Sequence, residues 1–481
     1  MSDPKGFLKT KRQSSKYRPV YERVADYREV NIAREDEETN LQSSRCMNCG
    51  TPFCHWACPV GNYIPEWNNL VFERNWQKAY VILEAANNFP EITGRLCPAL
   101  CESSCVLGIN DDPVTIRENE LGIIEYAFKK GLVRPKKPAM RTGKKIAVIG
   151  SGPAGLAASS QLNKAGHKVV VFEKGDKIGG LLRYGIPDFK LEKHIIDRRI
   201  DLMKKEGIEF IVKFNAGVDI SAEKILKEFD AVCLAIGSGV PRDLKIDGRG
   251  ASGVHFAMDY LIQSNKRVSG EINPNTKLID AKGKKVVVIG GGDTGSDCVG
   301  VANRQGAASV TQIELMSKPA EYRTEDYPWP MYPAILKTSS SHEEGASRLW
   351  QVSTKRFIAE NGRVNRIECV KVEFEQVAKN VPAIIKEIPS SNFEIEADLV
   401  ILAMGFIHPE HRGLLEALST EYDGRGNVKT NEHFMTSVKK VFAAGDAHRG
   451  QSLVIWAMSE ARRAAHNIDC FLMGKSDLPE F

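Results

Sequence analysis

Long apolar runs are missing from this 481-residue sequence. No run reaches the roughly 18 residues that a membrane-spanning helix needs, and the N-terminus is polar, so neither a membrane span nor a signal peptide is expected. A strong excess of one charge is also missing, because the formal net charge is only +5. A charge this small gives no reason to expect a nucleic-acid partner. We therefore expect a cytoplasmic protein that binds neither membrane nor nucleic acid.

Cysteine is scarce outside one part of the chain, because seven of the 11 cysteines fall between Cys46 and Cys105. In a reducing compartment, such crowding indicates a metal or an iron–sulfur cluster rather than disulfides. A chain of 481 residues is too long for one hydrophobic core, and the usual domain size predicts roughly three domains. The cysteine-rich part is therefore expected to form a domain of its own.

The first cysteines have the spacing C-x2-C-x4-C-x3-C-P and are Cys46, Cys49, Cys54 and Cys58. Thiolates this close together can bind the irons of one cubane, and the last cysteine, before a proline, is directed to a neighbouring cluster. Three more follow at uniform spacing, Cys97, Cys101 and Cys105. Zinc is the competing metal, but structural zinc sites usually pair two short knuckles into four ligands, which seven clustered cysteines fit poorly. The spacing favours iron–sulfur clusters.

Seven cysteines are one ligand short of what two four-iron clusters need, and Glu120 is a candidate for the missing ligand. It lies on the apolar face of a predicted helix, in the series Ile116, Glu120, Ile123, Ile124 and Ala127. A buried carboxylate requires a partner, and an iron is one such partner. A salt bridge to Arg117, or a position at the solvent edge, explains the pattern equally well.

A buried strand, Lys145 to Ile149, runs directly into a glycine-rich turn. Gly150, Gly152 and Gly155, with Pro153 and Ala154 between them, fit the G-x-G-x-x-G pattern. Such glycines let the backbone approach a pyrophosphate at the N-terminus of the next helix. Glu173 ends the second strand, 23 residues after Gly150, where a carboxylate can bind a ribose. The alternative, an ordinary glycine loop in an α/β core, does not require the strand, the spacing and the acid together.

The same pattern is repeated later in the chain. The strand from Lys284 to Ile289 leads into Gly290, Gly292, Asp293, Thr294 and Gly295, and Glu314 follows 24 residues after Gly290. Two fingerprints predict two dinucleotides, although a degenerate duplicated fold with one cofactor would carry the same pattern. Cys298 stands alone after this fingerprint, and without a Cys-x-x-Cys pair a dithiol reductase lacks its reactive group.

Other glycines in the α/β part of the chain indicate further contacts with the cofactors. Gly445-Asp446 follows an apolar strand near the C-terminus, where Asp446 is expected to accept hydrogen bonds from ribityl hydroxyls of the first cofactor. Further backbone contacts to the cofactors are expected at Gly180, Leu181, Gly237 and Gly405.

We predict an α/β protein with two Rossmann-like folds, the second inserted in the first, after a mainly helical iron–sulfur domain. The predicted domains are residues 1–140, residues 141–278 with 405–481 for FAD, and residues 279–404 for NAD(P)H.

These motifs together resemble, over nearly the full length, the small (beta) subunit of bacterial glutamate synthase. The resemblance is carried by Cys46 to Pro59, Cys97 to Cys105, Pro113-Val114-Thr115-Ile116, Gly150 to Gly155, Tyr184-Gly185-Ile186-Pro187, Gly290 to Gly295, Pro328-Trp329-Pro330, Ser339-Ser340-Ser341-His342-Glu343-Glu344-Gly345 and Ala443-Ala444-Gly445-Asp446. The segment from Ser339 to Gly345 points to glutamate synthase rather than to flavin reductases in general.

The resemblance implies FAD on the first fold, NADPH on the second and two [4Fe-4S] clusters in the N-terminal domain. It assigns one cluster to Cys46, Cys49, Cys54 and Cys105, and the other to Cys58, Cys97, Cys101 and Glu120. NADH stays possible, because a carboxylate at Glu314 would repel a 2′-phosphate, whereas Lys318 and Arg323 could bind it.

The resemblance also implies a partner. The chain would pass electrons from NADPH, through FAD and the clusters, to a large (alpha) subunit that makes L-glutamate from L-glutamine and 2-oxoglutarate. No side chain of this chain is expected to act as a catalytic group. Two alternatives remain: a ferredoxin-coupled or electron-bifurcating NADPH oxidoreductase subunit with another partner, and a structural or regulatory module whose cofactor sites are relics.

Overall fold

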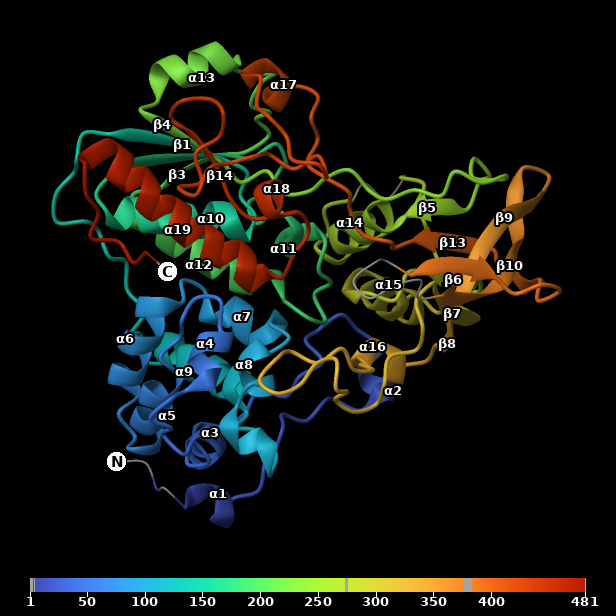
Figure 1. Cartoon of the computed structure of the whole chain (residues 1–481), viewed down its shortest axis with the longest axis horizontal. Helices are drawn as coiled ribbons and strands as arrows, with labels where there is room; N and C mark the ends of the chain where they lie inside the picture. The colour runs from blue at the N-terminus through green and yellow to red at the C-terminus, as the bar shows by residue number, and fades with distance from the viewer. Residues whose placement is uncertain (1–2, 4, 273–275, 376–382, 481) are drawn as a thin grey trace.

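The computed structural model describes residues 3, 5–272, 276–375 and 383–480. A helical N-terminal domain lies beside two α/β folds, and the C-terminal helix returns to the first of these folds (Figure 1). This arrangement confirms the predicted fold class, including the insertion of the second fold into the first. Among the helices of the described residues, none combines the length and the apolar character needed to cross a lipid bilayer.

The N-terminal domain consists of helices, most of which share one apolar core. They are α1 (Gly6–Lys9), α2 (Val20–Arg23), α3 (Asp36–Ser43), α4 (Phe53–Ala57), α5 (Ile64–Phe72), α6 (Trp76–Ala86), α7 (Pro90–Leu96), α8 (Leu100–Ser103), a 3-10 helix at Val106–Ile109 and α9 (Ile116–Lys129). Helices α7 and α9 lie in close contact at Gly94. A Cβ atom at this position would stand only 2.8 Å from the Cβ atom of Leu121, so a larger residue would separate the helices. This glycine brings α9, and with it Glu120, close to the cysteine-bearing loops.

The first α/β fold is a parallel five-stranded sheet in the order β14-β4-β1-β2-β3. Its strands are β1 (Lys145–Ile149), β2 (Lys168–Phe172), β3 (Glu209–Ile211), β4 (Ala231–Leu234) and β14 (Val441–Ala443). Alternate residues of each strand point to opposite faces of the sheet. The residues on both faces are apolar, so the sheet is buried on both sides. One face is covered by α10 (Pro153–Lys164), α12 (Lys193–Glu206) and α19 (Val454–Met473), and the other by α13 (Ala222–Glu228) and α17 (Leu414–Leu418). The sheet is completed only by the C-terminal strand.

The second fold is another parallel sheet, in the order β5-β13-β6-β7-β8. Its strands are β5 (Val254–Phe256), β6 (Lys285–Ile289), β7 (Ser309–Glu314), β8 (Ser347–Trp350) and β13 (Leu399–Leu402). One face packs on α14 (Ala257–Val268) and α15 (Asp293–Arg304), and the other on an antiparallel sheet of β9 (Val352–Glu360), β10 (Arg363–Glu375), β11 (Ile384–Glu387) and β12 (Phe393–Glu396). The short helices α11 (Leu181–Tyr184), α16 (Ser340–Glu343) and α18 (Asp446–Arg449) lie in loops.

The predicted boundary at residue 278 between the FAD and NAD(P)H domains does not match the way the strands pair. Strand β5 pairs with β13 of the second sheet, and α14 packs in the same core as α15. The sequence alone places both elements in the first fold, because the second fingerprint begins only at Gly290. The chain therefore enters the second fold between β4 and β5, before Val254.

An N-terminal arm ties the second fold to the helical domain. The backbone N–H of Val30 donates to the carbonyl of Phe189 at 3.0 Å. The guanidinium of Arg23 pairs at 2.9 Å with Glu344, which also pairs with Arg304, and the Arg304 and Glu344 side chains are fully buried. Buried charges of this kind require their partners, so the arm is fixed against α15 and α16.

A buried ion pair joins the helical domain to the first α/β fold. Arg199 of α12 donates to the two carboxylate oxygens of Glu91 on α7 at 2.6 and 2.8 Å. The Glu91 side chain is fully buried, and that of Arg199 is only 7% exposed. Removing one partner would leave the other charge uncompensated in the interior.

We predict that Glu91→Gln lowers the free energy of unfolding by about 3 to 5 kcal/mol. The matched control is Glu394→Gln, which breaks a pair with Arg366 between side chains that are 43% and 40% exposed. That change should cost less than about 1 kcal/mol. Urea unfolding of the cofactor-loaded protein, followed by helical circular dichroism, measures both. Equal losses for the two variants would contradict the structural importance of the buried pair.

Candidate functional site

The first glycine-rich turn has no room for side chains at two of its glycines. Gly150 has a φ of +98°, and a Cβ atom there would lie 2.4 Å from the carbonyl oxygen of Ala235. A Cβ atom at Gly155 would lie 1.9 Å from the carbonyl oxygen of Gly150. Gly152, which precedes α10, has nothing within 4 Å of its Cβ position. The turn is thus closed toward the sheet and open at the helix N-terminus, which suits a pyrophosphate.

Glu173, at the end of β2, is tied to this turn. Its carboxylate accepts hydrogen bonds from the backbone N–H groups of Ser151 at 3.1 Å and Gly175 at 2.7 Å. The Ser151 hydroxyl donates to the same carboxylate at 2.5 Å. The acid therefore lies next to the turn, as the motif predicts, and shapes the turn in addition to any contact with a ribose.

Two distant glycines converge on the same turn. Gly180, which precedes α11 and Leu181, would place a Cβ atom 2.8 Å from Cα of Gly152. Gly445 would place one 2.7 Å from Cβ of Ala154, and Pro153 is the first residue of α10. The structure thus brings the predicted residues around the first turn from three segments of the chain.

Asp446 follows Gly445, at the start of α18. Burial raises the pKa of Asp446 to about 6, and Ser452 donates to its Oδ1 atom at 2.9 Å. Gly237 follows β4 with a φ of +71° and free space at its Cβ position. Asp446 therefore lies next to Gly445, and Gly237 follows the segment that contacts Gly150, while their contacts with the first cofactor stay a prediction.

Two residues that sequence reasoning missed support this region. Glu460 on α19 is buried and accepts from the backbone N–H of Gly445 at 3.1 Å, while pairing with Arg449 at 3.0 Å. Ser238 donates its hydroxyl to the carbonyl of Asp446 at 3.0 Å. A carboxylate within the apolar pattern of α19 was the available signal for Glu460, as it was for Glu120. Ser238 carries no such signal.

The second turn repeats the geometry of the first. A Cβ atom at Gly290 would lie 2.3 Å from the Ala403 carbonyl oxygen, and one at Gly295 would lie 2.2 Å from the Gly290 carbonyl oxygen. Gly292 again has free space before α15, whose first residues are Asp293 and Thr294. The close match between the two turns supports two nucleotide sites rather than one.

The acid and the last glycine of the second fold also have defined partners. Glu314 accepts from the backbone N–H groups of Gly291 and Met316, the latter at 3.1 Å. Gly405 has a φ of +81°, and its Cβ position lies 2.6 Å from the side-chain amide of Gln451. Gln451 accepts from the N–H of Phe406 at 2.7 Å, so Gly405 lies where the C-terminal segment meets the second fold.

Of the two cations expected near a 2′-phosphate, Lys318 and Arg323 have different surroundings. Lys318 is half exposed, and its Nζ atom lies 5.7 Å from the ring centroid of Trp350, the register partner of Glu314. Arg323 donates to the carbonyls of Tyr327 at 2.8 Å, Ser103 at 3.0 Å and Met331. The structure therefore brings Lys318 to the end of β7 but directs Arg323 toward the N-terminal domain.

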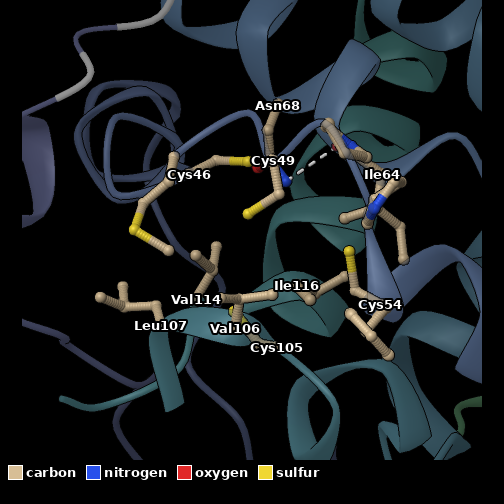
Figure 2. Close-up of a pocket in the computed structure, with 14 residues that line it drawn as sticks. Cys46, Cys49, Cys54, Ile64, Asn68, Cys105, Val106, Leu107, Val114 and Ile116 are labelled. Atoms are coloured by element: carbon tan, nitrogen blue, oxygen red, sulfur yellow. Dashed lines mark hydrogen bonds between the residues drawn. The ribbon is translucent and has the colours of Figure 1, made fainter. Parts of the chain in front are cut away.

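The cysteines line two separate pockets in the N-terminal domain. Figure 2 shows the side chains of Cys46, Cys49, Cys54 and Cys105 around an open space. Apolar residues complete its wall, among them Ile64, Val114 and Ile116. Burial raises the pKa of the Cys46 thiol to about 12. A bound metal favours the thiolate form of such a buried thiol, so this pocket suits a metal cluster. We call this space the distal pocket.

The other pocket, called the proximal pocket, is lined by Cys58, Cys97, Cys101 and Glu120. Burial raises the pKa of Cys58 to about 12, that of Cys97 to about 11 and that of Glu120 to about 7. The Glu120 carboxylate accepts from Asn62 at 2.9 Å, Thr93 at 2.5 Å and Asn87 at 3.3 Å. Within the described ranges no cation forms an ion pair with Glu120, and Arg117, which lines the same pocket, donates to the Cys97 carbonyl at 3.4 Å instead.

Each pocket brings together the four residues that the resemblance assigns to one cluster, and their role as ligands stays a prediction. In the part of the chain that the structure describes, no group of three or more His, Cys, Asp or Glu side chains is arranged to hold one metal ion. The proximal pocket also includes Ile455 of α19, whereas the distal pocket is lined only by residues of the N-terminal domain. The proximal pocket is therefore the one that contacts the first α/β fold.

Comparison with known proteins supports an iron–sulfur domain followed by a nucleotide-binding region. A family model described as pyridine nucleotide-disulphide oxidoreductase matches residues 144–461. A model described as dihydropyrimidine dehydrogenase domain II, 4Fe-4S cluster, matches residues 23–132, which favours iron–sulfur over zinc. FprA of Mycobacterium tuberculosis in complex with NADPH has a TM-score of 0.54 at 17% identity, over 70% of this chain and 87% of that chain, which indicates the shared fold.

Similarity to curated proteins extends over the whole chain. The glutamate synthase [NADPH] small chain of Mycobacterium tuberculosis is 52% identical, over 100% of this chain and 98% of the relative. That of Bacillus subtilis is 42% identical over 100% of both chains. The glutamate synthase [NADH] of Schizosaccharomyces pombe is 45% identical over 99% of this chain, but over only 23% of its own length. This chain therefore belongs to the family of glutamate synthase small chains.

Proposed function

We propose that this chain takes a hydride from NADPH onto FAD and passes single electrons through two [4Fe-4S] clusters to a glutamate synthase large chain. When bound, NADPH supplies the hydride, FAD accepts two electrons and releases them singly, and each cluster carries one electron. The observation that carries this proposal is the pair of separate cysteine-lined pockets, one of which contacts the FAD-type fold.

The two glycine-rich turns would bind the nucleotide cofactors, and the two cysteine-lined pockets would bind the clusters. The open face at Gly152 and the N–H groups of α10 would receive the FAD pyrophosphate, with Asp446 as an acceptor for hydroxyls. Gly292 and α15 would receive the pyrophosphate of NADPH in the same way. Cys58, Cys97, Cys101 and Glu120 would bind one cluster, and the four cysteines of the distal pocket the other.

The position of the pockets supports an order of transfer. Ser459 of α19 donates its hydroxyl to the carbonyl of Pro59 at 2.6 Å, next to Cys58 of the proximal pocket. Ile455 of the same helix lines that pocket, and α19 begins shortly after Asp446. We infer that electrons leave the flavin through the proximal pocket and reach the distal pocket second.

The large chain is inferred from a relative. In the glutamate synthase of Schizosaccharomyces pombe, the region similar to this chain is 23% of one longer polypeptide. A separate large chain would supply the corresponding remainder here. The alternative, a ferredoxin-type or electron-bifurcating oxidoreductase subunit, shares the cofactor arrangement and differs in its partner.

An exposed aromatic group marks where that partner would dock. Trp56, between Cys54 and Cys58, is 74% exposed. Its ring centroid lies 5.6 Å from that of Phe53, which lines the distal pocket and lies 4.6 Å from Trp329. Tryptophan is enriched at the centres of protein interfaces. The partner must approach the pocket from which electrons leave, so we assign this aromatic group to the large-chain interface.

The cluster assignment predicts the iron content. The wild-type chain should hold roughly eight irons, whereas Cys54→Ser and Cys101→Ser should each reduce this to about four. In Cys101→Ser, NADPH should still bleach the flavin, but electrons should no longer reach the distal cluster. Iron analysis and electron paramagnetic resonance measure both effects. Cys470→Ser, which lies outside both pockets, is the control and should retain all the iron.

A wild-type chain with about four irons would contradict the assignment of two clusters. So would a Cys101→Ser variant whose distal cluster is reduced at the wild-type rate. Retention of all the iron in Cys101→Ser would remove that residue from the ligand set.

Coenzyme preference tests the role of Lys318. A charge-assisted hydrogen bond to the 2′-phosphate would be lost in Lys318→Ala, so the KM for NADPH should rise about tenfold while the KM for NADH stays unchanged. Arg323→Ala is the comparison, because that guanidinium binds backbone carbonyls. If Arg323→Ala changes the preference and Lys318→Ala does not, the assignment of the two residues is wrong.

The interface assignment predicts weaker binding of the large chain by Trp56→Ala. Loss of a central tryptophan should raise the Kd about tenfold or more, with NADPH oxidation by ferricyanide unchanged. Met140→Ala is the matched control, since Met140 is 83% exposed and is not among the residues that line either pocket. Calorimetric titration of the large chain into each variant measures the change. Equal Kd values for wild type and Trp56→Ala would refute the assignment.

A further inference from the structure

The segment from Ser339 to Gly345 has no role in the cofactor contacts described so far. Ser339 precedes α16, and His342 lies on that short helix against α15 and β7. Its Nε2 atom is 2.7 Å from Oε1 of Gln312 on β7, and its Nδ1 atom is 3.1 Å from the backbone nitrogen of Ser339. The ring is therefore bonded on both sides.

The hydrogen-bond directions along this chain of groups follow from one backbone carbonyl. The side-chain amide of Gln312 donates to the carbonyl oxygen of Gly290 at 2.8 Å, and a carbonyl can only accept. The amide oxygen of Gln312 must then face His342 and accept from an Nε2–H group. Nδ1 of His342 is left as an acceptor for the N–H of Ser339. The neutral tautomer of His342 with its proton on Nε2 therefore satisfies every group in this hydrogen-bond network.

The charge around the ring favours the same state. Burial, together with repulsion from Arg348 and Lys190, lowers the pKa of His342 to about 4. A protonated ring would place a second donor at Nδ1, opposite the N–H of Ser339. His342 is therefore neutral at physiological pH.

The two ends of this hydrogen-bond network lie at the second nucleotide turn and at the start of α15. Gly290 is the first glycine of the fingerprint, and its carbonyl oxygen lies 2.2 Å from the Cβ position of Gly295. At the other end, the Ser339 hydroxyl lies 2.5 Å from that of Ser296, in the first turn of α15. The chain of hydrogen bonds thus links the turn to the helix whose N–H groups face the nucleotide phosphates.

We propose that His342 is a positioning residue for the second nucleotide, holding the Gly290 carbonyl through Gln312 and the start of α15 through Ser339. The inference rests on the proposed function in one respect, that this fold binds NADPH. It adds a residue that does not touch the nucleotide and acts through the shape of the turn.

Steady-state kinetics of the cofactor-loaded protein, with ferricyanide as acceptor, tests this proposal. His342→Leu leaves the Gln312 amide oxygen without a donor, and we expect the KM for NADPH to rise about tenfold with kcat within about twofold of wild type. His342→Gln supplies a side-chain N–H to Gln312 and should restore most of the affinity. A role in stability alone would not give this division between KM and kcat, or this rescue.

The matched control is Ser341→Ala on the same helix. The Ser341 hydroxyl is buried and has no hydrogen-bond partner among the described residues, so its removal should leave KM unchanged. An unchanged KM in His342→Leu, or a His342→Gln variant as impaired as His342→Leu, would overturn the proposal. Failure of the proposed function would instead be seen in the wild type, as an absence of NADPH oxidation.

Discussion

Both nucleotide turns depend on one kind of contact, the approach of a backbone carbonyl to a glycine where a side chain would otherwise stand. The Gly150 carbonyl fills the Cβ position of Gly155, and the Gly290 carbonyl fills that of Gly295. Each contact brings a helix N-terminus against the end of a buried strand, so that N–H groups and the helix dipole meet the phosphates. Any larger residue at Gly155 or Gly295 would separate helix from strand and remove the site.

A second constraint acts in the N-terminal domain, where several thiols and the Glu120 carboxylate are buried and, among the described residues, Glu120 forms no ion pair. Burial raises the pKa of Cys58 and of Glu120, and α9 can bring Glu120 to the proximal pocket only because Gly94 lets the helices touch. The cost of burying such groups is offset when a cluster binds, which couples cluster binding to the folding of this domain. The contact of Pro59 with α19 then sets the proximal pocket against the FAD-type fold.

Local spacing was sufficient to predict what local geometry determines. The glycine fingerprints, their acids and the seven clustered cysteines are short patterns, and the structure brings the residues of each set together, whereas spacing alone left the role of Glu120 open. Contacts between distant segments could not be predicted in this way: Glu460 reaches Gly445 across a loop, β5 joins the second sheet across a long insertion, and Arg323 binds Ser103 in another domain. The composition-based expectation of a cytoplasmic protein stays a prediction.

The measurement that tests the account most directly is NADPH-dependent formation of glutamate from glutamine and 2-oxoglutarate, by this chain alone and with a glutamate synthase large chain. The account predicts that the chain alone oxidises NADPH with ferricyanide and forms no glutamate. With the large chain added, glutamate should form, and it should cease in a Cys101→Ser variant that still reduces its flavin. Glutamate formation by this chain alone, or undiminished formation by Cys101→Ser, would contradict the account.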